Sequence, residues 1–152
     1  ETMTLEQWRK VVDVDLTAQF LMARAAGQRM IKAGKGGAII STASMSGHIV
    51  NVPQPQCAYN AAKAGLIHLT KSLATEWARY NIRVNCISPG YMATPLSIDV
   101  PRERMENWFF FAPMKRMGLP EELQGAVVYL ASEAASYTTG ADIIIDGGYS
   151  CV

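Results

Sequence analysis

Apolar residues along this chain switch between helical spacing and short continuous runs, which predicts helices alternating with buried strands. Thr4-Leu5-Glu6-Gln7 is typical of a capped helix start, because Thr4 and Gln7 can each satisfy a free backbone N–H. We expect this helix to reach about Ala33, where several glycines end it. One apolar stripe should follow it, formed by Trp8, Val12, Leu16, Phe20 and Ala23.

The remaining elements follow in regular order. Strands are expected at residues 38–43, 82–87 and 141–145. Helices are expected at residues 57–80, 102–111 and 120–131, the last with a proline and acidic residues in its first turn. Alternating helices and strands predict an α/β fold in which three parallel strands are joined by right-handed crossovers and flanked by helices. Without internal repeats or a linker, the chain is expected to form a single domain.

Ser44, Tyr59 and Lys63 form the pattern Ser-x14-Tyr-x3-Lys. Tyr59 and Lys63 would share one face of the helix at residues 57–80, since residues four apart are neighbours there. A tyrosine normally keeps its proton up to about pH 10, and an ammonium group nearby favours the phenolate. Such a phenol can exchange a proton with a carbonyl or alcohol oxygen near neutral pH. Ser44, at the end of a predicted strand, can hydrogen-bond the same oxygen.

Tyr-x3-Lys alone is a weak signal, but its surroundings make it specific. They are residues 44–47 (SMSG), 59–65 (YNAAKAG) and 85–90 (NCISPG). With these stretches the chain resembles the short-chain dehydrogenase/reductase family from about residue 4 to residue 148. Residues 44–54 (SMSGHIVNVPQ) are most similar to its polyol and ketose branch, which includes mannitol dehydrogenases, sorbose reductases, and arabinitol and xylulose enzymes.

The resemblance implies the C-terminal half of a Rossmann-type, doubly wound parallel sheet. The family begins with a glycine-rich phosphate-binding turn and several βα units, and no stretch of this chain matches them. Residues 1–152 are therefore expected to form one partial domain that lacks the N-terminal dinucleotide-binding half. The strands of that half would pair beside residues 38–43, so this strand should have an open edge.

The resemblance also implies roles for individual residues. Tyr59 would be the acid/base, Ser44 would steady the reacting oxygen, and Lys63 would also bind the nicotinamide ribose. The cofactor would be NADP or NAD, with NADP favoured. Residues 89–94 (PGYMAT) resemble the turn that contacts the nicotinamide, through the backbone after Gly90 and the Thr94 hydroxyl. The implied cofactor-binding positions are Tyr59, Lys63, Pro89, Gly90, Met92 and Thr94.

Asp15 departs from the family pattern, which usually has an asparagine at this position. That asparagine holds a water in a proton relay to the lysine. A carboxylate keeps the acceptor but has no N–H donor, and its charge would stabilise the Lys63 ammonium. Asp15 is therefore a candidate relay residue, and a solvated helix position is the alternative.

Other candidates stay open. Ser41, Thr42 and Ser46 compete with Ser44, which is favoured because it lies three residues before Gly47, as the family's catalytic serine does. His48, with Gln54 and Gln56, is a candidate for hydrogen-bonding substrate hydroxyls. Residues 108–111 (WFFF) would form core or oligomer surface, or part of the family's mobile lid over the substrate.

Composition excludes several other classes of protein. The chain has 14 basic and 13 acidic residues and no charge runs, which argues against nucleic-acid binding. No apolar stretch approaches the roughly 20 residues needed to span a bilayer, and the first residues do not resemble a signal peptide. Cys57, Cys86 and Cys151 are too scattered for a disulfide framework or a metal site, so we expect reduced thiols and a cytoplasmic protein.

Two functions follow. The favoured one is the catalytic half of a nicotinamide-dependent oxidoreductase that interconverts a ketose or small ketone with its polyol or alcohol, in a homo-oligomeric enzyme. The alternative is a catalytically silent fragment that acts only in subunit association. The coding sequence upstream separates them, because a Thr-Gly-x3-Gly-x-Gly turn there would support the enzyme.

Overall fold

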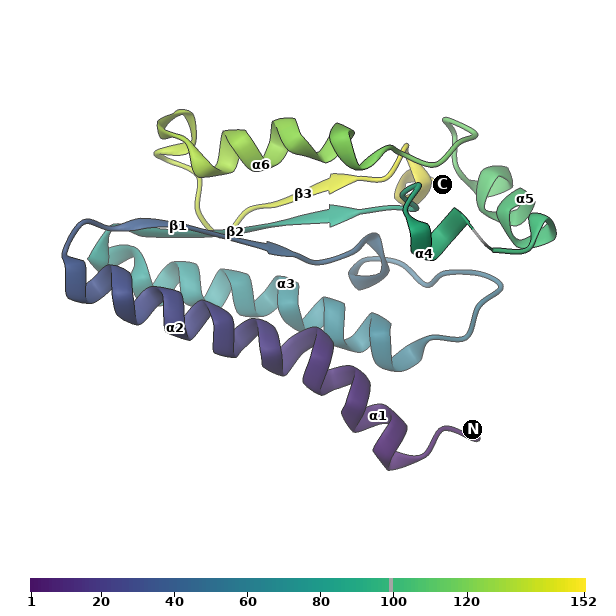
Figure 1. The fold of residues 1–152 in the computed structure, drawn as a ribbon, viewed down its shortest axis with the longest axis horizontal. Coiled ribbons are helices and arrows are strands. Elements are labelled where there is room, and N and C mark those ends of the chain that lie inside the picture. Colours follow the sequence, from purple (N-terminus) through teal and green to yellow (C-terminus); the bar gives the residue numbers. More distant parts are fainter. Residues whose placement is uncertain (99) are drawn as a thin grey trace.

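The computed structural model describes residues 1–98 and 100–152. Its three strands, β1 (Gly37–Thr42), β2 (Ile82–Pro89) and β3 (Asp142–Ile145), form one parallel sheet in the order β1-β2-β3 (Figure 1). The central strand β2 is buried over nearly its whole length, whereas β1 is only partly buried at most of its residues. The expected three-stranded parallel sheet is confirmed.

The first helix is interrupted by a π-helical turn that the sequence analysis did not anticipate. It consists of α1 (Leu5–Val12), the π-helical segment η1 (Asp13–Thr17) and α2 (Ala18–Ala33). Its start is as expected: Gln7 N–H donates to Thr4 Oγ1 at 3.2 Å and Thr4 N–H donates to Gln7 Oε1 at 2.8 Å. A π turn adds a residue to the helical repeat and often marks a functional position.

The apolar stripe predicted for this helix does not face the core along its whole length. Ala23 is buried, but Trp8 and Phe20 are each 38% exposed. The prediction assumed a regular helix from end to end. The extra residue of η1 rotates the segments before and after it relative to one another, so positions spaced by three and four residues no longer lie on one face.

Helices cover the two faces of the sheet. Figure 1 shows α2 and α3 (Cys57–Trp77) on one face and α6 (Gln124–Ala131) on the other. The main core lies between the sheet and the α2–α3 layer, where Ala23, Leu73 and Val84 pack together. On α2, a Cβ at Gly27 would lie 2.8 Å from the Trp77 ring, so only glycine permits this close contact between α2 and α3.

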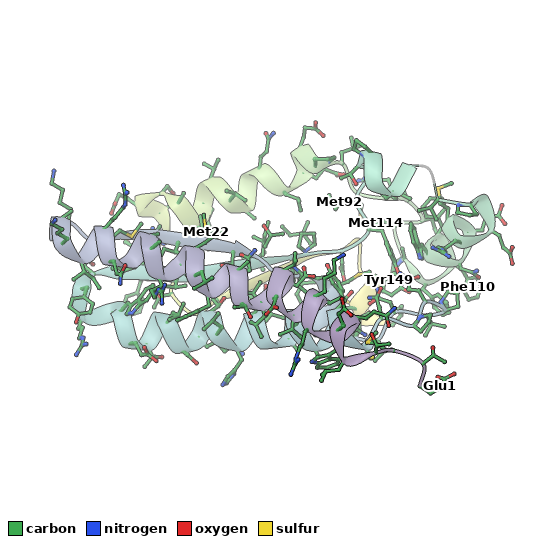
Figure 2. All side chains as sticks on the ribbon, turned by 60° about the horizontal axis from the view of Figure 1, so that its bottom comes forward. Glu1, Met22, Met92, Phe110, Met114 and Tyr149 are labelled. Atoms are coloured by element: carbon green, nitrogen blue, oxygen red, sulfur yellow. The ribbon has the colours of Figure 1, made fainter. Side chains whose placement is uncertain are left out.

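The chain between β2 and β3 adds short elements beside the carboxyl ends of the strands. They are α4 (Pro95–Ile98), α5 (Arg102–Phe111) and a 3₁₀ turn, η4 (Pro120–Leu123), which leads into α6. The helix expected at residues 102–111 is confirmed, and the one expected at 120–131 begins as this 3₁₀ turn. Figure 2 shows Met92, Met114 and Tyr149 at the end of the molecule near α5, with Phe110 farther out.

No helix within the described ranges has both the length and the hydropathy needed to cross a membrane.

The reactivity of the Cys86 thiol tests the burial of the central strand β2. Burial, and then the neighbouring Asp142 carboxylate, raises the pKa of the Cys86 thiol from 9.0 to about 12, whereas Cys57 and Cys151 are exposed. Because the thiolate is the reactive form, we expect iodoacetamide at about pH 8 to alkylate Cys57 and Cys151 but not Cys86. Denaturant should expose all three thiols. Peptide mass spectrometry reads the result, and equal native rates for Cys86 and Cys57 would contradict this packing.

Candidate active site

One cavity lies beside the carboxyl ends of β1 and β2, where the predicted catalytic and cofactor-binding residues meet. It has a volume of about 340 Å³. Ser44 and Tyr59 line it together with Gly90, Met92 and Thr94 from the turn after β2. In parallel α/β sheets, ligands bind in crevices at the carboxyl ends of the strands. The serine and tyrosine, 15 positions apart in the sequence, therefore face a single space.

Lys63 lies just behind this cavity with little contact with solvent. Its side chain is 9% exposed. Lys63 Nζ donates to the Thr42 carbonyl at 3.2 Å, lies 3.2 Å from Asp15 Oδ1, and lies 5.4 Å from the centre of the Tyr59 ring. An ammonium so far from water needs such partners to stay charged. The lysine and tyrosine lie four positions apart on α3, so helix geometry holds them together.

Asp15 reaches Lys63 from the π-helical turn η1. Its side chain is 24% exposed and so is neither fully solvated nor fully buried. The next residue of η1, Leu16, faces Gly65 of α3, where a Cβ would lie 3.0 Å from Leu16 Cδ2. The absence of a side chain at Gly65 lets η1 lie close against α3. The predicted proximity of Asp15 and Lys63 is present in the structure, while the relay role stays a prediction.

Among the four competing hydroxyl residues, Ser44 and Ser46 line the cavity. Ser46 Oγ donates to Asn51 Oδ1 at 2.6 Å, so its proton is committed within the protein. Ser44 Oγ accepts from Ser46 N–H at 3.1 Å. That bond uses a lone pair and leaves the Ser44 proton for a bound oxygen. The geometry favours Ser44 as the donor to a substrate.

Gly47 brings the loop after Ser44 close to α3. Ser44 caps a short 3₁₀ turn, η2 (Met45–Gly47). A Cβ at Gly47 would lie 2.6 Å from Ile67 Cδ1 and 2.9 Å from the backbone carbon of Lys63. A side chain here would push the loop away from the helix that carries Tyr59 and Lys63. The spacing of Ser44 and Gly47 therefore has a packing reason.

The turn at residues 89–94 contributes unequally to the cavity. Pro89 is buried at the end of β2, beside Ile145 of β3, and is not part of the cavity lining. At Gly90 a Cβ would lie 2.7 Å from Asp146 Cα, so glycine is required where the two strand ends approach. Met92 and Thr94 follow, and the Thr94 hydroxyl lies 3.1 Å from Ser97 Oγ.

A group of polar side chains in this cavity was largely missed by the sequence analysis. Asn51 Nδ2 and Gln54 Nε2 both donate to Tyr91 Oη, at 3.1 and 3.0 Å. Trp108 Nε1 donates to Gln54 Oε1 at 3.0 Å, and its ring stacks on Tyr91. Gln54 and Gln56 were proposed beforehand as substrate contacts and residues 108–111 as a possible lid, whereas Asn51 and the hydrogen bonds to Tyr91 were not anticipated. The clustering of amide residues between 51 and 56 was the available signal.

His48, an open candidate for substrate contact, lies elsewhere. His48 does not line the cavity; its Nε2 lies 2.6 Å from Asp142 Oδ2 at the start of β3. The chain direction changes at η2, and His48 directly follows this turn. Ser88 Oγ donates to the same carboxylate oxygen at 2.8 Å, so this cluster ties the loop to the sheet.

In the part of the chain that the structure describes, no three His, Cys, Asp or Glu side chains are arranged to hold a metal ion.

Asn85 has a structural role: its Nδ2 donates to the Thr138 carbonyl and its Oδ1 accepts from Ala141 N–H. The chemistry available at the cavity is therefore that of hydroxyl, phenol, ammonium and amide groups.

Comparison with known proteins identifies the family to which the chain is similar. A family profile described as Enoyl-(Acyl carrier protein) reductase matches residues 1–150. A probable NADP-dependent mannitol dehydrogenase of Yarrowia lipolytica is 56% identical over 146 residues, and a sorbose reductase of Candida albicans is 51% identical over 146 residues. Each match covers 96% of this chain and 52% of the relative. The chain thus spans about half the length of these curated relatives.

Solved structures agree with the sequence relatives. A short-chain type dehydrogenase/reductase from Mycobacterium marinum has 48% sequence identity and a TM-score of 0.95, over 99% of this chain and 59% of that one. The expected half of a Rossmann-type fold is confirmed by this match. With a family profile that matches nearly every residue, the chain belongs to the short-chain dehydrogenase/reductase family.

Proposed function

We propose that this chain is the catalytic half of a nicotinamide-dependent oxidoreductase that interconverts a polyol with its ketose. The observation that carries the proposal is the single cavity lined by Ser44 and Tyr59 on one side and by Gly90, Met92 and Thr94 on the other. It puts a hydroxyl, a phenol beside a buried ammonium, and an irregular backbone turn around one space. These groups suit proton exchange with an alcohol or carbonyl oxygen.

The described residues fit a nicotinamide. Gly90 has no Cβ, and it joins the end of β2 to a turn that lines the cavity. Met92 and Thr94 would hold the carboxamide, and Lys63 with Tyr59 would hold the ribose. The glycine-rich turn that binds pyrophosphate in this family has no counterpart in residues 1–152. The proposal therefore concerns the full open reading frame that encodes this chain.

Each residue has a defined task in the proposed reaction. A bound nicotinamide supplies or accepts hydride. In the reductive direction, Tyr59 Oη gives its proton to the carbonyl oxygen, and in the oxidative direction it takes the proton back. Ser44 Oγ donates a hydrogen bond to the same oxygen and orients it. The Lys63 ammonium stabilises negative charge on the phenol oxygen.

The relatives guide the choice of substrate and cofactor. Mannitol dehydrogenases of Yarrowia lipolytica and Alternaria alternata are named NADP-dependent, and other relatives are named for sorbose, arabinitol and galactitol. We therefore favour NADP as the cofactor and a polyol or ketose as the substrate. A panel of these compounds with NADP and with NAD defines the activity.

Replacing the proposed acid/base tests the mechanism. In the full protein, we expect Tyr59→Phe to lower kcat by about a hundredfold or more, because it removes the hydroxyl proton that Tyr59 would transfer in general acid–base catalysis. Tyr137→Phe is the matched control, since Tyr137 is fully exposed and far along the chain. Steady-state turnover and cofactor binding by fluorescence are measured for both variants. Near-normal turnover in Tyr59→Phe would refute the assignment.

The ion pair between Asp15 and Lys63 predicts a pH effect. The Asp15 carboxylate partly cancels the attraction of the ammonium for negative charge on Tyr59. Asp15→Asn should therefore move the pH profile of kcat/KM to lower pH, by up to about one unit or 1.4 kcal/mol. Asp13→Asn is the control, because Asp13 accepts from Thr17 instead. Superimposable profiles for Asp15→Asn and the native protein would remove Asp15 from the relay.

Subunit association is the second function that a specific observation supports. Leu5, Val14 and Met22 on the first helix are 62%, 62% and 72% exposed, an unusual amount of large apolar surface, and Met22 is labelled in Figure 2. We propose that this surface pairs with a second copy in a homo-oligomer. Met22→Glu should shift the sedimentation profile toward smaller species, whereas Lys32→Glu should not. An unchanged profile in Met22→Glu would exclude this helix from the interface.

A further inference from the structure

The cavity holds a second phenol, Tyr91, whose oxygen receives two amide donors. Asn51 Nδ2 lies 3.1 Å and Gln54 Nε2 lies 3.0 Å from Tyr91 Oη, and all three residues line the cavity. An amide nitrogen donates but cannot accept. The Tyr91 proton therefore has no acceptor in either amide and is directed to another group.

The orientation of the Gln54 amide is fixed by Trp108. The indole Nε1 only donates, and it lies 3.0 Å from Gln54 Oε1. A reversed amide would place two donors against each other at Trp108. Trp108 is 5% exposed, and its ring stacks on Tyr91 with centroids 4.0 Å apart and planes 11° apart. Trp108 thus fixes the ring plane of Tyr91 by stacking, and it fixes the orientation of the Gln54 amide that donates to Tyr91.

Asn51 is oriented by an independent set of bonds. Its Oδ1 accepts from Ser46 Oγ at 2.6 Å and from Gln56 Nε2 at 2.7 Å, and the residue is only 3% exposed. Its nitrogen must then face Tyr91. Two separately oriented amide groups therefore donate to the same phenol oxygen. Together they leave the Tyr91 hydroxyl to act as a donor.

Tyr91 is unsuited to moving a proton in the reaction. Burial raises the pKa of Tyr91 to about 12, so its hydroxyl stays protonated near neutral pH. Inside the protein the Tyr91 hydroxyl is hydrogen-bonded to Tyr149, whose ring meets Tyr91 edge-on with centroids 5.5 Å apart, and this bond adds to the raised pKa of Tyr91. A neutral phenol with both lone pairs engaged is a directional hydrogen-bond donor toward a ligand.

We infer that Tyr91 binds a second substrate oxygen, distinct from the one that reacts at Tyr59, and that Gln54 positions Tyr91 for this task. The inference rests on the proposed function and extends it to substrate selection. A substrate with a second oxygen can take the Tyr91 hydrogen bond in place of Tyr149, whereas an alcohol with a single hydroxyl group cannot. The cavity should therefore prefer substrates with several hydroxyl groups over alcohols that carry only one.

The test compares two substrates in the full protein with its better cofactor. The selectivity is the kcat/KM for mannitol divided by that for isopropanol, which has a single hydroxyl group. Tyr91→Phe should lower this ratio about tenfold or more, the effect of one lost hydrogen bond to a substrate. A ratio within about twofold of the native value would overturn the inference, as would an equal loss of kcat/KM on both substrates.

Gln54 is tested as a positioning residue by a charge-preserving and a charge-changing variant. Gln54→Glu keeps an acceptor for Trp108 but has no N–H for Tyr91, whose proton would turn toward the introduced carboxylate. Its selectivity should fall as it does in Tyr91→Phe. Gln54→Asn retains the amide chemistry and should recover part of the selectivity. Equal selectivity in Gln54→Glu and the native protein would remove Gln54 from the mechanism.

Two controls separate binding from a structural role. Tyr137→Phe removes an exposed phenol and should leave the ratio unchanged. Tyr149→Phe removes the competing acceptor and should maintain the ratio or increase it. If Tyr149→Phe lowers the ratio as much as Tyr91→Phe does, the aromatic cluster acts by packing alone and the inference fails.

A binding measurement decides the inference even if the protein turns over neither substrate, an outcome that defeats the proposed function. Saturation-transfer NMR with mannitol is recorded for the native protein and for Tyr91→Phe. Binding that weakens about tenfold in Tyr91→Phe supports the inference, since one hydrogen bond is lost. Equal binding by both proteins, or no binding of mannitol by the native protein, overturns it.

Discussion

The site depends on keeping one ammonium charged where water scarcely reaches it. Lys63 is 9% exposed and is held by the Asp15 carboxylate and the Thr42 carbonyl, with the Tyr59 ring 5.4 Å away. An unpaired ammonium at this depth would be energetically costly. These partners come from three different elements, η1, β1 and α3. The charge on Lys63 therefore requires the correct packing of the whole helix–sheet layer.

The close packing around Lys63 explains several glycines as a set. Gly65 allows η1 to approach α3, and Gly47 allows the loop after Ser44 to lie against the same helix. Gly90 does the same where β2 and β3 end together. Each is a point where a single Cβ would separate two elements that share the cavity. Small residues thus set the size and position of the site as much as the polar residues do.

Periodicity and capping predicted most of the fold, because they are local properties. The capping box at Thr4, the helix at residues 102–111 and the alternation of helices and strands along the chain all follow from residues close in sequence. The π turn at Asp13–Thr17 was not anticipated, and in the structure it lies against α3, where Leu16 faces Gly65. The partner of His48, Asp142, could not be found from local sequence either, because it is 94 positions away.

Two tyrosines in one cavity acquire different tasks from their neighbours. Tyr59 has the Lys63 ammonium 5.4 Å from the centre of its ring. Tyr91 has amide donors and burial instead, and its pKa rises to about 12. Composition alone treats the two phenols as equal. Only the first partner set was readable from spacing, as Tyr-x3-Lys on one helix. The second joins residues 51, 54, 91 and 108, whose separations follow no helical or strand period. Sequence patterns therefore found the proposed reacting group, whereas the proposed selection of substrate emerges only from the three-dimensional arrangement.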